Sequence, residues 1–472
     1  MRIRKDVWRL SKINPWHPDI LWYARAIGEL KKRSVSDPTS WKYQAAIHET
    51  SVSPNPDKRF WSQCQHNSWY FLPWHRMYLF YFEQIIASTI VQLGGPKDWS
   101  LPYWNYSDSS NADATKLPPA FYAAATPPPV DPNDSNPLLD TTRWRGNDGK
   151  SVTVNAGQTS LKCLTEPDFI VPAAGLGFGG PVTVFHHGGG RGEPMGEVDK
   201  VPHGAIHGAV SGDMGSFDTA ALDPIFWLHH ANIDRLWTVW LKRNPNHKNP
   251  ADPKWLMNLG FEFHDATGTI VSLKCGQVVN TQASPLSYQY EDESDPLGRR
   301  AGVVPPRRLA MAEEAIPEKV GATARPVSLT GRTASASFAV TPPTGPARMA
   351  EGAESPEIYL NLENVSGPLH PTSYSVYLNL PPDESPSQHP ELLAGNMPLF
   401  GLKEASRPDE QHSGSGLHYA YRVGDIVRSL QEKGDWDPNN VRVTFVPDYE
   451  VGGRAGEPQS EVKVGQISFY RK

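Results

Sequence analysis

Histidine spacing constrains the fold of this chain more than any other feature of its sequence. The stretch HNSWYFLPWHR, residues 66–76, places His66 and His75 nine positions apart, with Pro73 and several aromatic residues between them. Proline is tolerated in the first turn of a helix and is damaging further in, so we expect a long helix to begin near Pro73. His75 then lies in the first turn and His66 lies before it, while His48 belongs to the preceding helical segment.

A second group of histidines lies in the middle of the chain. His203 and His207 are four positions apart, which places both imidazoles on one face of a helix. His229 and His230 open the next predicted helix, residues 223–244. A lone histidine, a single H-x-x-x-H pair or an aromatic stripe is more often structural than functional. Two groups, each offering three histidines from a helical frame, outweigh that interpretation and predict two metal half-sites.

The scarcity of other ligand types beside these histidines narrows the choice of metal. Imidazole is the usual protein ligand for copper, zinc and iron, whereas thiolates and carboxylates suit softer or harder ions. Catalytic zinc commonly includes a carboxylate or thiolate ligand, so two all-histidine sites favour copper. A zinc hydrolase would need a carboxylate base beside a three-ligand site, and the sequence has no H-E-x-x-H motif.

Composition and charge argue against other classes of protein. The net charge of -6 and the pI near 6.2 disfavour nucleic-acid binding, which normally uses a basic face. No apolar run approaches the roughly 20 residues of a membrane span. The start MRIRKDVWRLSKINPWHP has no apolar stretch that would make it a secretory signal. We therefore expect no membrane span, and a cytoplasmic location is favoured.

The sequence divides into three regions. Residues 1–290 contain the predicted helices and long loops rich in Pro, Gly and Asn, and they predict a mainly α domain. Residues 291–352 are dominated by Pro, Ala, Arg, Glu and Thr, which predicts a linker with exposed dibasic pairs. Residues 353–472 carry short alternating runs such as EIYLNLENV and VRVTFVP, which predict an antiparallel β domain.

Three longer stretches of the first region resemble the signatures of type 3 copper proteins. They are HNSWYFLPWHRMYLFYFEQII, LPYWNYSD and DPIFWLHHANIDRLW, and the family comprises tyrosinases, catechol oxidases and molluscan-type haemocyanins. The resemblance covers most of residues 1–290 and implies a four-helix core that holds two copper ions. Carried over position by position, it assigns the first copper to His48, His66 and His75 and the second to His203, His207 and His230. His229 is then a neighbour rather than a ligand.

Smaller matches add to this resemblance. Cys64 precedes His66 by two positions, as in family members that have a thioether between that cysteine and that histidine. Tyr288 and Tyr290 are similar to the Y-x-Y sequence that closes the catalytic domain of the family. Arg9 sits where the family often has an arginine near its first strand.

The resemblance also implies an activity, namely the oxidation of o-diphenols to o-quinones with dioxygen and, where the site admits it, hydroxylation of monophenols. Phe217 takes the place of the family's gate over the second copper. Gly204 follows His203, where many strong monophenolases have an asparagine that orients a water together with an acid. Gly204 and Phe217 favour diphenol oxidation. The candidate acids are Glu193, Glu197 and Asp199, and spacing does not choose among them.

Residues 353–472 weakly resemble the C-terminal β domain of plant-type polyphenol oxidases, which covers the copper site and keeps the enzyme latent. The segment GNMPLFG, residues 395–401, is the candidate plug, with Met397, Leu399 or Phe400 inserted. The alternative is that these residues pack the β domain itself. Activation would follow cleavage of the linker by a protease, or acid loosening of the interface. A haemocyanin-like oxygen carrier is the alternative function, and a homo-oligomer is left open.

Overall fold

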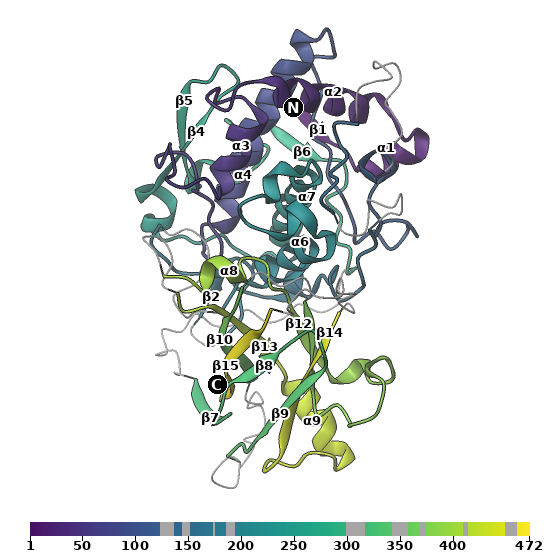
Figure 1. Cartoon of the computed structure of the whole chain (residues 1–472), viewed down its shortest axis with the longest axis vertical. Coiled ribbons are helices and arrows are strands. Elements are labelled where there is room, and N and C mark those ends of the chain that lie inside the picture. The colour runs from purple at the N-terminus through teal and green to yellow at the C-terminus, as the bar shows by residue number, and fades with distance from the viewer. Residues whose placement is uncertain are drawn as a thin grey trace.

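The computed structural model describes residues 1–122, 136–143, 152–172, 175–185, 194–298, 317–341, 357–368, 373–408, 414–448 and 460–472. The chain forms a helical part that holds the N-terminus and a β-rich part that holds the C-terminus (Figure 1). The short helix α8 (Leu402–Ala405) lies at the boundary between the two parts. The α-plus-β fold class predicted from the sequence is therefore confirmed.

Helices form the frame of the first part, as the apolar patterns predicted. α4 begins two residues before Pro73, so the proline falls in the first turn, where its missing N–H costs nothing. The helices of this part are α1 (Val7–Ile13), α2 (Pro18–Lys32), α3 (Trp41–His48), α4 (Phe71–Gln92), α5 (Pro119–Tyr122), α6 (Ala205–Val210) and α7 (Ile225–Arg243). Shorter helical turns are η1 (Lys162–Thr165), η2 (Asp199–Gly204), η3 (Gly212–Gly215), η4 (Ala220–Leu222), η5 (Lys254–Asn258) and η6 (Cys275–Gln277).

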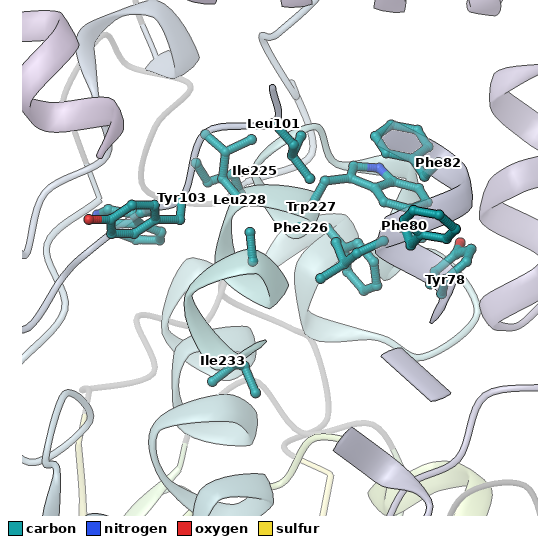
Figure 2. Close-up of a cluster of buried hydrophobic side chains, with 14 of the residues drawn as sticks. Tyr78, Phe80, Phe82, Leu101, Tyr103, Ile225, Phe226, Trp227, Leu228 and Ile233 are labelled. Atoms are coloured by element: carbon teal, nitrogen blue, oxygen red, sulfur yellow. The ribbon is translucent and has the colours of Figure 1, made fainter. Parts of the chain in front are cut away.

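Aromatic side chains lock α4 against α7 in the core of the helical part (Figure 2). Phe82 stacks on Trp227 with ring centroids 3.4 Å apart, and Tyr78 packs against the same indole at 4.7 Å. All three side chains are buried. Because this packing fixes the two helices relative to each other, it also fixes the spacing between the histidines that they carry.

A buried charge network closes the helical part. Strand β1 (Arg2–Arg4) pairs in parallel with β6 (Tyr288–Tyr290), and the Arg4 guanidinium donates to Glu83 at 2.6 Å and to the Tyr290 hydroxyl at 2.9 Å. Asp234 accepts from Arg76 and Tyr288, both at 2.5 Å. Arg9, which the sequence placed near the first strand, lies on α1 just after that strand and forms exposed ion pairs with Glu291 and Asp292.

Two further pairs of strands lie in the helical part. β2 (Ile170–Val171) pairs in parallel with β3 (Gly180–Pro181), and β4 (Gly260–His264) pairs antiparallel with β5 (Ile270–Lys274).

The β-rich part consists of two antiparallel sheets. One has the order β13–β10–β15–β7, with β8 also paired to β15, and the other has the order β12–β11–β14–β9. Leu360 of β10 faces Phe469 of β15 in register, and both pack in one core with Val443 of β14 from the other sheet. The strands are β7 (Glu318–Ala322), β8 (Val327–Leu329), β9 (Ala334–Phe338), β10 (Ile358–Ser366), β11 (Tyr374–Leu378), β12 (Leu393–Met397), β13 (Leu417–Arg422), β14 (Val441–Pro447) and β15 (Val462–Arg471). The helical segments here are η7 (Pro386–Gln388), η8 (Pro390–Leu392), α8 and α9 (Gly424–Lys433).

The boundaries of the predicted linker differ from the structure at both ends. Lys242 and Arg243 at the end of α7 form ion pairs with Glu293 and Asp295, so the helical part continues past residue 290. Strands β7, β8 and β9 lie inside the predicted linker of residues 291–352 and pair with β14 and β15. These strands are short and poor in large apolar residues, so long-range pairing, not local pattern, creates them. Among the described residues, no helix has the length and apolar character needed to cross a membrane.

Candidate metal centre

The first half-site gathers His48, His66 and His75. His48 is the last residue of α3, His75 lies in the second turn of α4, and His66 lies in the loop between the helices. Their ring centroids are 5.0 to 5.7 Å apart, and all three side chains are buried. The structure thus brings together the three histidines that the sequence grouped.

Hydrogen bonds fix which ring nitrogen faces the centre of this half-site. Nδ1 of His75 lies 2.8 Å from the carbonyl oxygen of Phe71, and Nδ1 of His48 lies 3.2 Å from that of Phe217. A carbonyl oxygen can only accept, so each Nδ1 carries the proton and each Nε2 keeps its lone pair. Among the described residues, the buried Nε2 of His75 has no hydrogen-bond partner. A metal ion satisfies such a nitrogen.

The second half-site gathers His203, His207 and His230. His203 lies on η2 just before its last residue, Gly204, His207 lies on α6, and His230 lies on α7. The ring centroids of His207 and His230 lie 5.4 Å apart, and their Nε2 atoms lie 3.2 Å apart. Nδ1 of His207 is held by the carbonyl oxygen of Met214 at 2.8 Å. The Nε2 lone pair of His207 therefore faces another imidazole nitrogen, an arrangement that a cation between the rings stabilises.

The two half-sites form one cluster. His75 stacks on His230 with centroids 4.5 Å apart, and His66 stacks on His203 at 5.3 Å. Burial, and then the neighbouring imidazoles, lower the pKa of His75, His207 and His230 well below the ordinary value of 6.5. The rings are therefore neutral near pH 7, which is the form that binds a metal.

His229 lies directly beside the second half-site. Its ring centroid is 5.0 Å from that of His207, and its nitrogens fall within the same group of potential ligands as those of His203, His207 and His230. It is fully buried, and burial, together with the neighbouring His203 imidazole, lowers its pKa well below 6.5. Geometry alone thus groups four histidines here, and the choice of His230 over His229 stays a prediction.

The donor set fits copper. In the described part of the chain, the groups of side chains able to hold a metal consist of histidines and Cys64, with no carboxylate among them. Imidazole-rich sites without carboxylates suit copper better than magnesium, calcium or manganese. Cys64 lies with its sulfur within 4.8 Å of ring nitrogens of His48 and His66, and the thioether to His66 stays a prediction.

Phe217 and Phe400 cover the histidine cluster. The Phe217 ring lies 4.5 Å from the ring of His66 in the first half-site, whereas the sequence placed this gate over the second copper. Phe400, which precedes α8, stacks on His207 with centroids 3.9 Å apart and an interplanar angle of 10°. The two phenylalanine rings meet edge to face at 4.3 Å. Phe400 packs in the core of the helical part although it belongs to the C-terminal, β-rich part.

The other plug candidates lie elsewhere. Met397 and Leu399 are buried in the core of the β-rich part, so the structure places only Phe400 of the three beside the histidines. Met397 and Leu399 instead pack within the β domain, which was the alternative that the sequence left open. A Cβ added at Gly204 would lie 3.5 Å from the ring of Pro398, so the plug segment also covers the position after His203.

The candidate acids have different surroundings. Glu197 accepts from Lys200 at 2.6 Å, and Lys200 also donates to the carbonyl oxygen of Ala420 in the C-terminal chain at 2.7 Å. Asp199 is buried and lies 2.9 Å from Nδ1 of His203. Glu193 lies outside the described residues.

Sequence reasoning missed the ion pairs between the two parts of the chain. Arg422 on β13 makes two hydrogen bonds, 3.1 and 3.2 Å long, to the buried carboxylate of Glu166. Lys403 on α8 reaches Asp218 at 3.3 Å. Burial, together with the charge of Glu197, raises the pKa of Glu166 to about 7 against the lowering effect of Arg422. No local sequence signal marks such pairs, because their members are 185 and 256 positions apart.

Comparison with known protein families agrees with this geometry. Residues 38–243 match the model of the common central domain of tyrosinase, and residues 249–300 match that of the polyphenol oxidase middle domain. Residues 316–472 match a domain of unknown function. The chain is 35% identical over 491 aligned residues to a tyrosinase from Hahella sp. (strain CCB-MM4), covering 100% of this chain and 99% of that protein. It is 28% identical to a chloroplastic polyphenol oxidase from Malus domestica, covering 91% of this chain and 74% of that protein.

Solved structures share the whole fold. A latent apple tyrosinase superposes with a TM-score of 0.61 at 23% identity, covering 99% of this chain and 97% of the other. A recombinant latent aurone synthase gives 0.66 at 22% identity, covering 100% and 90%. Both likenesses extend over the helical part and the β-rich part. With its paired histidine groups, its central-domain match and a full-length tyrosinase relative, the chain belongs to the tyrosinase family of type 3 copper proteins.

Proposed function

We propose that this protein is a polyphenol oxidase, which uses dioxygen to oxidise o-diphenols to o-quinones. The observation that carries the proposal is one buried cluster of six imidazoles, His48, His66, His75, His203, His207 and His230, contributed by two helical frames. Copper bound there supplies the activation of dioxygen and accepts the two electrons that a catechol loses.

The chain's own residues prepare the site for a phenol. The hydrogen bonds at Nδ1 of His75 and His207 hold each ring in one orientation, so the ligand nitrogens need no reorganisation when copper binds. Because the imidazoles are neutral, they would leave the positive charge of two bound copper ions uncompensated, which would favour a phenolate oxygen over a neutral phenol. The rings of Phe217 and Phe400 form an apolar wall that excludes water and accepts an aromatic ring.

The C-terminal, β-rich part acts as a lid that keeps the enzyme latent. Phe400 occupies the face of His207 with the stacking geometry that an aromatic substrate would adopt. Arg422 and Lys403 pair with Glu166 and Asp218 on the helical part and hold the lid in place. Cleavage by a protease within residues 299–316, which carry two Arg-Arg pairs, would release this lid.

Diphenol oxidation is the favoured activity. Gly204 offers no side chain that could orient a water, and Phe217 narrows the approach to the histidines. Asp199 and Glu197 each bind another residue of the chain, so neither is poised to work with a water beside Gly204. Hydroxylation of monophenols is therefore expected to be slower than oxidation of catechols.

We also propose the thioether between Cys64 and His66. Its formation joins the sulfur to a ring carbon and removes one hydrogen from each, an oxidation for which dioxygen serves as the acceptor. The cysteine is buried beside the ring nitrogens, and burial raises the pKa of its thiol well above the ordinary value. A linked His66 would be restrained although it lies in a loop.

Oxygen uptake tests the proposed function. Copper-loaded protein, intact and cleaved within residues 299–316, is given a monophenol or its catechol. We expect catechol consumption that rises after cleavage, with monophenol consumed more slowly. Reversible oxygen binding without consumption of either phenol would instead establish the haemocyanin-like alternative. Equal rates before and after cleavage would refute latency, and sedimentation of both samples reports whether either is a homo-oligomer.

A further inference from the structure

We propose that Asp199 is a positioning residue that joins the two copper half-sites. One of its carboxylate oxygens holds the His203 imidazole, and the other holds the backbone beside His66. This inference rests on the proposed function, because it assumes that both half-sites bind copper. It assigns to Asp199 a structural hold on the ligands in place of the water-orienting role for which the sequence nominated it.

The contacts of Asp199 reach both groups of histidines. Oδ1 accepts from Nδ1 of His203 at 2.9 Å, and the backbone carbonyl of Asp199 lies 3.1 Å from the same nitrogen. Oδ2 accepts from the backbone N–H of Asn67 at 2.7 Å. The Asp199 residue is 1% exposed, so water does not compete for these bonds. Hydrogen bonds to an ionised acceptor are about twice as strong as neutral ones.

The backbone on both sides is shaped for these contacts. Inside η2, Val201 has non-helical angles of φ -140 and ψ 122, so the Asp199–His203 contact spans a kink, not a regular helical turn. Asn67 has φ +47, a left-handed conformation that asparagine adopts more readily than most residues. In this conformation the N–H of Asn67, the residue immediately after His66, points at Asp199. The carboxylate therefore acts as a fixed point between two irregular segments.

The neighbouring acid on the same segment makes a different set of contacts. Glu197 accepts from Lys200, whose ammonium group also binds the carbonyl oxygen of Ala420. Within the described part of the chain, Glu197 accepts no hydrogen bond from an imidazole. Glu197 thus serves as a matched control, because it carries the same charge two positions away without contacting a ligand.

A carboxylate that accepts from the outer nitrogen of a metal-bound histidine fixes its tautomer and orientation and makes it a better donor. Losing such a partner typically weakens metal binding roughly 10- to 100-fold. Asp199→Ala is therefore expected to release the copper held by His203 at least about 10-fold faster than the wild type when a chelator is added. Asp199→Asn keeps the shape of the side chain and one acceptor, but it points an amide N–H at the N–H of Asn67. Its rate of copper release is therefore expected to lie between those of the wild type and Asp199→Ala.

The experiment measures copper retention, not turnover. Each copper-loaded variant is mixed with excess chelator, and the copper remaining per chain is followed by mass spectrometry of the metal. Melting of the copper-free proteins shows whether each variant folds, and the nearly isosteric Asp199→Asn keeps the test valid if Asp199→Ala does not. Glu197→Gln is expected to match the wild type.

Two results would overturn the proposal. The first is wild-type copper release from Asp199→Asn and Asp199→Ala, with an effect on turnover alone, since the carboxylate would then act on the substrate. The second is equally fast release from Glu197→Gln, which would show a general effect of charge. A wild-type protein that holds two coppers but consumes no phenol would refute the proposed function and leave this test intact, because retention does not require turnover.

Discussion

Truncation of the plug is the sharpest test of the lid. Phe400→Ala removes a ring that is 5% exposed and stacks on His207 while meeting Phe217 edge to face. Burial of a phenylalanine side chain contributes about 1.5–3 kcal/mol, and favourable aromatic pairs add about 0.5–1.5 kcal/mol. The docked plug should therefore lose about 2–4 kcal/mol relative to an open one.

This loss converts directly into activity if plug opening limits the intact enzyme. Since each 1.4 kcal/mol changes an equilibrium tenfold, the open population should rise by roughly 30- to 700-fold. The rate of the chain cleaved within residues 299–316 sets the ceiling, because in that form no plug remains to open. Phe400→Ala should thus bring the intact chain close to the cleaved rate, and it should leave the cleaved rate unchanged.

The assay is oxygen uptake with a catechol, performed on intact and cleaved forms of each variant. Phe445→Ala is the matched control, because Phe445 is a fully buried phenylalanine in the core of the β-rich part. It should lower the melting temperature without matching the gain in activity. Two outcomes would refute the reasoning: an intact Phe400→Ala enzyme as slow as the wild type, or equal activation by Phe445→Ala.

Three further predictions concern the metal ligands, the thioether and stability in acid. His230→Ala should lower bound copper from two ions to one per chain, whereas His229→Ala should retain both; metal analysis that gives the reverse would exchange their roles. The wild-type peptide containing Cys64 and His66 should be two hydrogen atoms lighter than its unlinked mass, and a peptide at the unlinked mass would exclude the thioether. Burial alone would raise the pKa of Asp234, but its arginine and tyrosine partners hold it below the ordinary 3.8. Ionised Asp234 therefore stabilises the folded protein fully above pH 3.8, and this stabilisation is lost as the pH falls below that value. A free energy of unfolding that stays constant below pH 3.8 would contradict the prediction.

The histidine groups were predictable because their signal is local. A spacing of four positions on a helix defines a shared face wherever the helix lies, so His203 and His207 could be paired from sequence. Pro73 located the start of α4 for an equally local reason, its tolerance in a first turn. The distinction between His229 and His230 rested on resemblance alone, since both are buried beside the same rings.

Features set by distant contacts could not be predicted. The strands within residues 317–341 include ASASF, which has little local β signal and becomes β9 by pairing with β14. The segment GNMPLFG contains three apolar plug candidates, and nothing in the local sequence distinguishes among them. Only the path of the chain after β12 shows that Phe400 leaves the β core for the histidine cluster while Met397 remains in it.

Gly401 explains why gate and plug act as one unit. Its φ of +79 lies in the left-handed region, and a Cβ there would lie 2.5 Å from the Phe217 ring. The glycine is therefore required both by the turn that directs Phe400 inward and by the ring of the gate beside it. While the lid is docked, Phe217 is confined between His66 and Phe400 and cannot swing toward the plug. Under the proposed latency, lid opening must precede gate movement, so a smaller side chain at position 217 activates the intact enzyme only as far as losing its contact with Phe400 loosens the lid.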